Sequence, residues 1–421
     1  MPWTDYCGGE VMKVIHVPRR FVASEWGGTE TVLLQISRAL IRAGHDTQIF
    51  TSMALADRAQ ETMQGVPVRR FSYTYPYWGL DEKDIHQMDR KGGNLLSLSL
   101  LWALLREPDV DLLHAHSGKR LGGVVRTAAK LRGIPYVITL HGGVFDVPKK
   151  EMEQMLAPIR NTFEWGKPFG AILGSRRVLQ DAAAVICVGE NEAVAAQKAL
   201  PDQRVEFIPN GVDSRAFAEG DAEGFRAQFA IPADRRLILC VSRIDFQKNQ
   251  IALVEAMKMV LDKYPDAHLV LIGPITVAHY HQRLMNKVAE LGLGNRITLI
   301  PGMTPDDPML KGAYHAAEVF CLPSLHEPFG IVILEAWAAR LPVVTAKVGG
   351  IPFFTKDGSD AIYVDPEDPS SVASGLIRVM DDPALREKLA TTGLRRARKE
   401  FDWSIVAERL LHIYQDLKQG G

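Results

Sequence analysis

The sequence predicts an α/β protein built from two doubly wound, Rossmann-like domains that face a central cleft. Short runs rich in β-branched residues alternate with amphipathic segments of helix length, which is typical of parallel sheets covered by helices. This pattern occurs twice along the chain. The 421 residues, of which 47% are hydrophobic and 24% charged, fit two to three globular domains and exclude a disordered or disulfide-scaffold protein.

The first domain is predicted over residues 12–207. Residues 1–11 (MPWTDYCGGEV) lack the basic start and apolar core of a signal peptide, so we expect a flexible leader. Helices are expected between most of the strands that follow. The predicted strands of this domain are 13–17, 47–51, 66–71, 111–115, 136–140 and 185–188.

The second domain is predicted over residues 208–400, because Pro209, Asn210 and Gly211 in IPNGVDSRAF interrupt the periodic pattern. Gly393 and the FDW step at 401–403 are expected to end the last helical region. Within 401–421, a terminal helix is expected to pack back on the first domain. The predicted strands of the second domain are 237–242, 269–273, 297–301, 319–323, 343–345 and 362–364.

The charge balance argues against nucleic acid as a partner, because no overall positive charge would attract it, so any anion site must be local. The 49 Lys and Arg residues against 50 Asp and Glu leave a formal charge of −1, although a slightly more basic first half permits weak peripheral membrane contact. The longest apolar stretch, 95–105, is too short to span a membrane. The four cysteines form no CxxC pair, so buried free thiols and a cytoplasmic location are expected.

Ligands of open parallel sheets bind beyond the carboxyl ends of the strands, so the loops there are expected to hold the site. Gly27 and Gly28 follow the first strand and open a helix, an arrangement that suits a phosphate group. A purely structural role for this pair is equally compatible with the sequence. The full GxGxxG and GxxxxGK[ST] patterns are absent, which argues against a dehydrogenase or a P-loop NTPase.

Arg243 and Lys248 lie in one loop, VSRIDFQKNQ, just before a predicted helix. Two cations near a helix N-terminus suit a diphosphate, since Arg offers a fixed fork of donors and Lys a point charge. For an arbitrary pair of this kind, two solvated surface cations would be the simpler interpretation.

The segment LPSLHEPFGIVILEAWAARLPVVT places Glu327 in a turn and Glu335 on the following helix, eight positions later. That separation is about two helical turns, so the two carboxylates could share a face. The residues around Glu335 are apolar on nearly every side, which predicts a buried helix. A buried carboxylate needs a partner or a ligand.

Together these segments resemble the family-4 retaining glycosyltransferases of GT-B fold, which carry an EX7E signature. The signature matches Glu327 and Glu335. WGGTE, TLHGG, IPNGVD, SRIDFQKN, LIGP and VGGIP occur in the same order as landmarks of that family, over essentially residues 12–418. The resemblance implies a nucleotide-sugar donor bound mainly by the second domain.

The resemblance also implies a role for individual residues. Arg243 and Lys248 would hold the diphosphate, Glu335 the ribose hydroxyls, and Glu327 the transferred sugar, with His141 beside its hydroxymethyl group. Gly27 and Gly28 would close on the donor diphosphate or the acceptor. The remaining donor-binding positions implied are Phe329, Gly330, Ile331, Gly273 and Asn210.

No metal site is expected. The pair His114/His116 is interpreted as pointing to opposite faces of a strand, and His279/His281 lacks a third ligand. No DxD-like motif follows a strand, so cationic side chains and dipoles are expected to stabilise the leaving diphosphate without a cofactor. The aromatic run FSYTYPYW at 71–78 is a candidate acceptor surface, although a packing role is equally compatible with it.

The sequence therefore predicts a retaining hexosyltransferase that uses a nucleoside diphosphate sugar, with UDP-sugar favoured over GDP-mannose. The acceptor would be a hydroxyl of a glycan, a lipid-linked or a small molecule. Two other classes stay open: a nucleotide-sugar epimerase of the same architecture, and a non-catalytic nucleotide- or carbohydrate-binding protein. The acidic and cationic residues Glu327, Glu335, Arg243 and Lys248 argue against the second.

Overall fold

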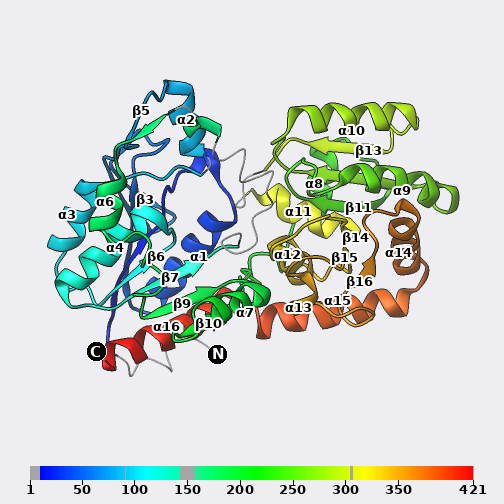
Figure 1. Ribbon diagram of the computed structural model, residues 1–421. Helices are drawn as coiled ribbons and strands as arrows, with labels where there is room; N and C mark the ends of the chain where they lie inside the picture. The colour runs from blue at the N-terminus through cyan, green and yellow to red at the C-terminus, as the bar shows by residue number, and fades with distance from the viewer. Residues whose placement is uncertain (1–9, 91, 143–156, 161, 304–306, 421) are drawn as a thin grey trace. The chain divides into compact units, whose positions relative to one another are not determined.

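The computed structural model describes residues 10–90, 92–142, 157–160, 162–303 and 307–420 (Figure 1). The chain divides into two compact units. The first comprises Met1–Pro209 together with Val406–Gly421, and the second comprises Asn210–Ile405. The division at Pro209/Asn210 lies within the turn-rich segment IPNGVD. Residues 1–9 of the expected leader lie outside the described residues.

The first unit contains an eight-stranded sheet in the order β10-β9-β7-β6-β1-β2-β4-β3, parallel except for the β3–β4 pair. A separate two-stranded sheet pairs β5 (Tyr77–Trp78) with β8 (Phe163–Glu164). The strands of the large sheet are β1 (Lys13–Val17), β2 (Asp46–Ser52), β3 (Gln60–Met63), β4 (Val66–Phe71), β6 (Leu112–Ala115), β7 (Tyr136–Leu140), β9 (Ala184–Cys187) and β10 (Val205–Phe207).

Helices cover both faces of this sheet (Figure 1). Ile15 and Leu113 face the helices α3 and α4, while Ile49 and Val68 pack against α1 on the other face. The helices are α1 (Gly28–Arg42), α2 (Glu82–Arg90), α3 (Leu98–Arg106), α4 (Lys119–Arg132), α6 (Lys167–Ile172) and α7 (Glu190–Ala199), with 3-10 turns at Ala23–Glu25 and Ala157–Ile159.

The C-terminal helix α16 (Trp403–Gln419) belongs to the first unit from Val406 onward. Its Tyr414 hydroxyl lies 2.6 Å from Nδ1 of His114 in β6. Its Lys418 forms an ion pair of 2.9 Å with Asp111, just before the same strand. The end of the chain thus packs on the sheet formed by its beginning.

The second unit contains a six-stranded parallel sheet in the order β13-β12-β11-β14-β15-β16. Its strands are β11 (Arg236–Val241), β12 (Ala267–Ile272), β13 (Ile297–Ile300), β14 (Ala317–Leu322), β15 (Val343–Ala346) and β16 (Ile362–Val364). Its helices are α8 (Ala222–Gln228), α9 (Gln250–Lys263), α10 (Ala278–Glu290), α11 (Pro308–Ala316), α12 (Ile331–Ala338), α13 (Ile351–Phe354), α14 (Pro369–Asp381) and α15 (Pro383–Lys399).

Successive residues of the central strand β11 enter two different cores. Leu237 and Leu239 pack with α8, α11 and α12, whereas Ile238 and Cys240 pack with α9, α10 and α14. This alternation is the period of two that a strand imposes on its side chains. It explains why continuous apolar runs, rather than alternating ones, mark the strands of this sheet.

The predicted α/β class is confirmed, and each of the twelve predicted strands is present within a few residues of its expected bounds. Four strands were not predicted: β3, β10, and the short pair β5 and β8. Strands β3 and β10 lie at sheet edges and have mostly half-buried or exposed side chains, so they lack the apolar run that marks an inner strand. In the part of the chain that the structure describes, every helix is too short or too polar to span a bilayer.

The prediction that Gly393 interrupts the last helical region is wrong, because α15 continues through it to Lys399. A β-carbon at Gly393 would lie 2.3 Å from Cδ1 of the buried Trp337. This glycine therefore makes room for an indole ring of α12 and does not end a helix.

Candidate active site

The candidate site of the second unit lies beyond the carboxyl ends of the neighbouring strands β11 and β14. In this sheet, β12 and β13 lie on one side of β11, and β14, β15 and β16 lie on its other side, so the strand order changes direction between β11 and β14. Such a change of direction opens a crevice between two strand-ending loops. The loops here are residues 242–249 and 323–330, and Leu325 N donates a hydrogen bond of 2.8 Å to the carbonyl of Gln247 to join them.

Lys248 and Glu327 form a buried ion pair between these two loops. Lys248 Nζ lies 2.5 Å from Glu327 Oε2, and only 11% and 8% of the two side chains are exposed. A buried charge of either sign requires such a partner. The lysine ammonium has three donors, so this pairing leaves it able to bind a further anion.

Arg243 lies in the same loop as Lys248 but is exposed, with 47% of its side chain accessible. Its guanidinium is 3.1 Å from Gln247 Oε1 and 3.2 Å from the buried Asp245 carboxylate. Asp245 also accepts hydrogen bonds from the backbone N–H groups of Gln247 and Lys248. One carboxylate therefore fixes the loop backbone and tethers the accessible cation.

Gly273 supports this loop through its lack of a side chain. A β-carbon there would lie 1.8 Å from the carbonyl oxygen of Ser242. The next residues continue the contact, since Ile244 N donates to Pro274 O at 2.9 Å. The structure thus places Gly273 against the backbone that leads to Arg243.

Three glycines shape the loop around Glu327. Gly330 is the N-cap residue of α12 and has a φ of 90°, a conformation that favours glycine. Gly350 N donates 2.9 Å to the carbonyl of Glu327. A β-carbon at Gly349 would lie 2.0 Å from that same carbonyl oxygen. The VGGIP segment therefore packs directly against the backbone of the acidic loop.

Glu335 lies on α12, and its partner is Tyr314 of α11, whose hydroxyl donates a hydrogen bond of 2.6 Å to Glu335 Oε2. Burial raises the pKa of Glu335, while this hydrogen bond opposes that shift. The carboxylate has further acceptor capacity beyond one tyrosine. Ile331 begins this helix and is half-buried.

Phe329 and Asn210 are also predicted donor-binding residues. In the described part of the chain, neither side chain forms a hydrogen bond or ion pair with Lys248, Glu327 or Arg243. Phe329 stacks on Phe354 at a centroid distance of 4.7 Å and belongs to the core, which leaves only its backbone for a ligand. Asn210 is buried, and its Oδ1 has no hydrogen-bond partner among the described residues.

In the first unit, Gly27 is the N-cap residue of α1, and Gly28 is the first residue of that helix. A β-carbon at Gly28 would meet nothing within 4 Å, so there is open space beside the helix start. Glu30, in the first turn, is buried and lies 3.5 Å from Arg20. Burial raises the pKa of Glu30. This acidic side chain was not singled out from the sequence.

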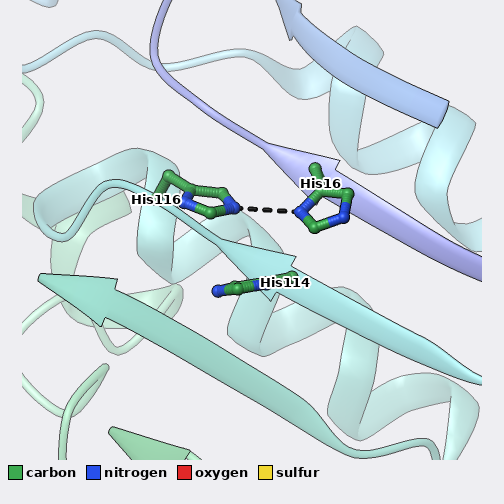
Figure 2. Close-up of side chains that lie close together, drawn as sticks. All are labelled: His16, His114 and His116. Carbon is green, nitrogen blue, oxygen red and sulfur yellow. Dashed lines mark hydrogen bonds between the residues drawn. The ribbon is translucent and has the colours of Figure 1, made fainter. Parts of the chain in front are cut away.

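His141 follows β7 and lies in a cluster of histidines with His16, His114 and His116. Figure 2 shows the last three of these side chains. The expectation that His114 and His116 point to opposite faces is wrong. Residues two apart on a strand share a face, and the two rings stack at 4.0 Å between centroids. Among the described residues, His16, His114 and His116 each place one ring nitrogen within 4.8 Å of the other two.

The aromatic run at 71–78 has mostly a packing role. Tyr75 and Tyr77 are buried, and the hydroxyls of Tyr73 and Tyr75 donate to Asp89 at 2.6 and 2.8 Å. Trp78 differs from them, because it is 66% exposed and stacks on Phe163 of β8 at 5.4 Å. Of the aromatic side chains in this run, Trp78 is therefore the one that is exposed and open to a ligand.

Sequence reasoning missed Tyr314, Asp245 and Gly349 as parts of the site. Gly349 had a usable signal, since it belongs to a GG pair in the segment that follows the predicted strand 343–345. Tyr314 had none, because it lies on a separate helix and meets Glu335 only in the folded unit.

Two family models match the chain, one in each half. The model described as "Glycosyl transferase 4-like domain" matches residues 27–211, and "Glycosyl transferases group 1" matches residues 221–396. A D-inositol 3-phosphate glycosyltransferase from Acidothermus cellulolyticus is 30% identical over 408 residues, which cover 93% of this chain and 86% of that protein. A protein of the same name from Thermobispora bispora is 30% identical over 406 residues, covering 93% and 90%.

Solved structures resemble the chain in fold. A sucrose-phosphate synthase from Thermosynechococcus elongatus superposes with a TM-score of 0.73 at 22% identity, covering 97% of this chain and 100% of that one. The Anabaena protein HepE in complex with UDP-glucose gives 0.70 at 20% identity, covering 96% and 100%. With two matched family models spanning most of its length and relatives of 30% identity over nearly all of it, the chain belongs to the group 1 glycosyltransferases of family-4 type, with the GT-B fold.

Proposed function

We propose that this glycosyltransferase is a retaining hexosyltransferase that uses a nucleoside diphosphate sugar, with UDP-sugar the favoured donor and GDP-mannose the alternative. The observation that carries the proposal is the buried pair Lys248–Glu327 beside the accessible Arg243, at the carboxyl edge of the second sheet. Two cations in one strand-ending loop, Arg243 and Lys248, suit a diphosphate. The carboxylate of Glu327, paired with Lys248, suits the hydroxyls of a neutral sugar. The UDP-glucose named for HepE supports the same donor class.

In the proposed reaction, the bond between the sugar and the diphosphate breaks, and negative charge grows on the departing phosphate. Arg243 and Lys248 would stabilise that charge, which lowers the barrier because the stabilisation is greater in the transition state than in the bound donor. The proton of the acceptor hydroxyl would pass to an oxygen of the departing phosphate on the same face of the sugar. The new bond would then have the anomeric configuration of the old one.

The other site residues bind and orient the donor in this proposal. Glu335 would accept hydrogen bonds from the two ribose hydroxyls, because a carboxylate has about four lone-pair sites and the bond from Tyr314 uses one of them. Glu327 would contact the transferred sugar. For the first unit, we propose that Gly27 and Gly28 contact the donor diphosphate or the acceptor and that His141 contacts the hydroxymethyl group of the transferred sugar.

We propose a hydroxyl of a small molecule as the acceptor, ahead of a glycan or a lipid-linked molecule. The name shared by the two relatives, D-inositol 3-phosphate glycosyltransferase, supports a small phosphorylated polyol. No metal ion is assigned to the transfer step, because the protein itself supplies two cations beside the proposed diphosphate position.

A donor and acceptor panel tests this function. UDP-glucose, UDP-N-acetylglucosamine, GDP-mannose and ADP-glucose are each incubated with inositol phosphate, a glycan or no acceptor, with and without EDTA. Proton NMR of the product reports its anomeric configuration. We expect a UDP-sugar to give a product of retained configuration that EDTA does not abolish.

Other outcomes of the panel identify the rival functions. Isomerised donor sugar in the absence of any acceptor would indicate the epimerase. Saturable nucleotide binding without turnover of any donor would indicate a binding protein. A product of inverted configuration would overturn the retaining assignment, and loss of transfer in EDTA with recovery in Mg²⁺ would overturn the metal-free one.

A further inference from the structure

Three of the four clustered histidines form a continuous hydrogen-bonded chain in the first unit. His16 Nδ1 lies 3.0 Å from His116 Nε2, which is the dashed contact in Figure 2. His116 Nδ1 then lies 2.9 Å from Nε2 of His141. This hydrogen-bonded chain of histidines begins with His16 inside strand β1 and ends with His141, the residue that follows β7. The proposed function places His141 beside the transferred sugar.

The topology of the sheet creates this chain. His16 and His114 are direct partners in the register of β1 and β6, at the position where the strand order changes direction. Their neighbours Ile15 and Leu113 point into the core on the opposite face. The histidines therefore share the other face, and His116 extends from the end of β6 toward His141.

All three histidines of the chain are neutral at physiological pH. Burial lowers the pKa of His16 to about 3 and that of His141 to about 4. Burial, and then the neighbouring histidines, lower the pKa of His116 well below its usual range. Each neutral ring carries one proton, so each has one donor nitrogen and one acceptor nitrogen.

The buried end of the chain sets the direction of its hydrogen bonds. His16 Nε2 is buried and has no hydrogen-bond partner among the described residues. An orphaned buried N–H is rarer in proteins than an orphaned acceptor, so this nitrogen carries the lone pair and Nδ1 carries the proton. His16 then donates to His116 Nε2, and His116 Nδ1 in turn donates to His141 Nε2. That leaves the proton of His141 on Nδ1.

His114 does not belong to this chain, because both of its nitrogens are already used. Nδ1 lies 2.6 Å from the Tyr414 hydroxyl, and Nε2 lies 2.6 Å from Thr139 Oγ1. A metal ion held by His16, His114 and His116 would require His114 to give up one of these contacts. The hydrogen-bonded chain needs no such change.

We propose that His116 and His16 are positioning residues that hold His141 in the Nδ1–H tautomer, so that His141 presents a hydrogen-bond donor to an oxygen of the bound sugar. The identity of that ligand rests on the proposed function. The tautomer does not, and it can be measured on the protein without any substrate.

The test is side-chain NMR of the full chain labelled with 15N-histidine, because the two ring nitrogens of a neutral histidine differ strongly in shift according to which one carries the proton. We expect His141 in the wild-type protein to be protonated at Nδ1. His16→Phe and His116→Phe should each shift His141 toward the Nε2–H form, because they remove a donor from the chain. His16→Asn should restore the wild-type form, since its amide can donate from near the Nδ1 position.

Tyr414→Phe is the matched control, because it removes a buried hydroxyl from His114 while leaving the three-membered chain intact. Its His141 spectrum should stay that of the wild type. An Nε2–H tautomer of His141 in the wild-type protein would overturn the proposal, and this measurement needs no variant to fold. So would an unchanged spectrum in both folded Phe variants.

Metal analysis of the same samples tests the competing interpretation, in which His16, His114 and His116 bind a metal ion. One equivalent of a bound transition metal in the wild-type protein, lost in His114→Phe, would identify a metal site and overturn the hydrogen-bonded chain. In donor assays, His16→Phe should lower turnover, and His16→Asn should recover it relative to His16→Phe. An Nδ1–H tautomer in a protein that transfers no sugar would leave the positioning role standing and refute only the proposed function.

Discussion

Lys248 and Glu327 are 79 residues apart in the chain, yet their side chains meet at 2.5 Å between two loops at the same edge of one sheet. Each charge is nearly inaccessible to water, so each depends on the other. The pair therefore links the stability of the second unit to the geometry of its site. This dependence can be measured separately from activity.

Removing either partner should destabilise the protein. Lys248→Met and Glu327→Gln each leave an unpaired buried charge, for which we expect a loss of about 3–5 kcal/mol in the free energy of unfolding. The double variant should recover part of that loss because no charge remains. Urea unfolding of the four proteins forms a double-mutant cycle. Additive losses would show that the two residues do not interact in solution.

Arg243→Ala should lower turnover without destabilising the protein. Arg243 is exposed, so its removal leaves no cavity, but the leaving diphosphate would lose one charged partner. We expect turnover to fall about 100-fold, by analogy with the loss of a single oxyanion donor, with a smaller change in donor affinity. Arg378→Ala, on the exposed side of α14, is the control for removal of a surface charge. Equal kinetics for the two variants would refute the diphosphate assignment.

Glu335 should make stability depend on pH. Burial raises the pKa of this carboxyl above its ordinary value of 4.5, so the folded protein binds more protons than the unfolded chain between 4.5 and the raised value. The free energy of unfolding therefore falls as the pH rises through that interval. Glu335→Gln should remove this decline while weakening nucleoside diphosphate binding.

Tyr314→Phe should have the opposite effect to Glu335→Gln on the pH dependence of stability. The tyrosine hydroxyl stabilises the charged form of Glu335, so its loss should extend the decline in stability to higher pH. Urea unfolding at a series of pH values, with calorimetric titration of UDP at neutral pH, measures both effects. A pH profile that Glu335→Gln leaves unchanged would show that Glu335 is not the group responsible.

Gly349→Ala should disturb the acidic loop by a direct clash. A β-carbon there would lie 2.0 Å from the carbonyl of Glu327, and the residue has a φ of 55°. Gly358→Ala is a matched control, since its φ is 68° and nothing lies within 4 Å of the added carbon. The control should lose about 1–2 kcal/mol from the left-handed conformation alone. Gly349→Ala should lose more, together with activity, and equal losses would argue against the clash.

Much of the fold could be predicted from residue patterns because inner strands of parallel sheets are buried on both faces. Runs such as LILCV at 237–241 are continuous in hydrophobicity for that reason and stand out from their helices. Strand β3 (QETM) has no such run, since it pairs at an edge and remains mostly accessible. Gly393 was wrongly predicted to interrupt a helix, because the reason for this glycine is the packing of Trp337, which lies 56 positions away in the sequence.

Local periodicity and turn-forming residues were enough to predict the α/β class and the two-unit organisation. They also predicted that Arg243, Lys248 and Glu327 lie in loops and that Glu335 lies on a helix. Which side chains come into contact could be learned only from the folded chain. Lys248 with Glu327, Tyr314 with Glu335, and His16 with His116 are contacts between elements distant in the chain. Strand order and packing create such contacts, and no local pattern in the sequence encodes them.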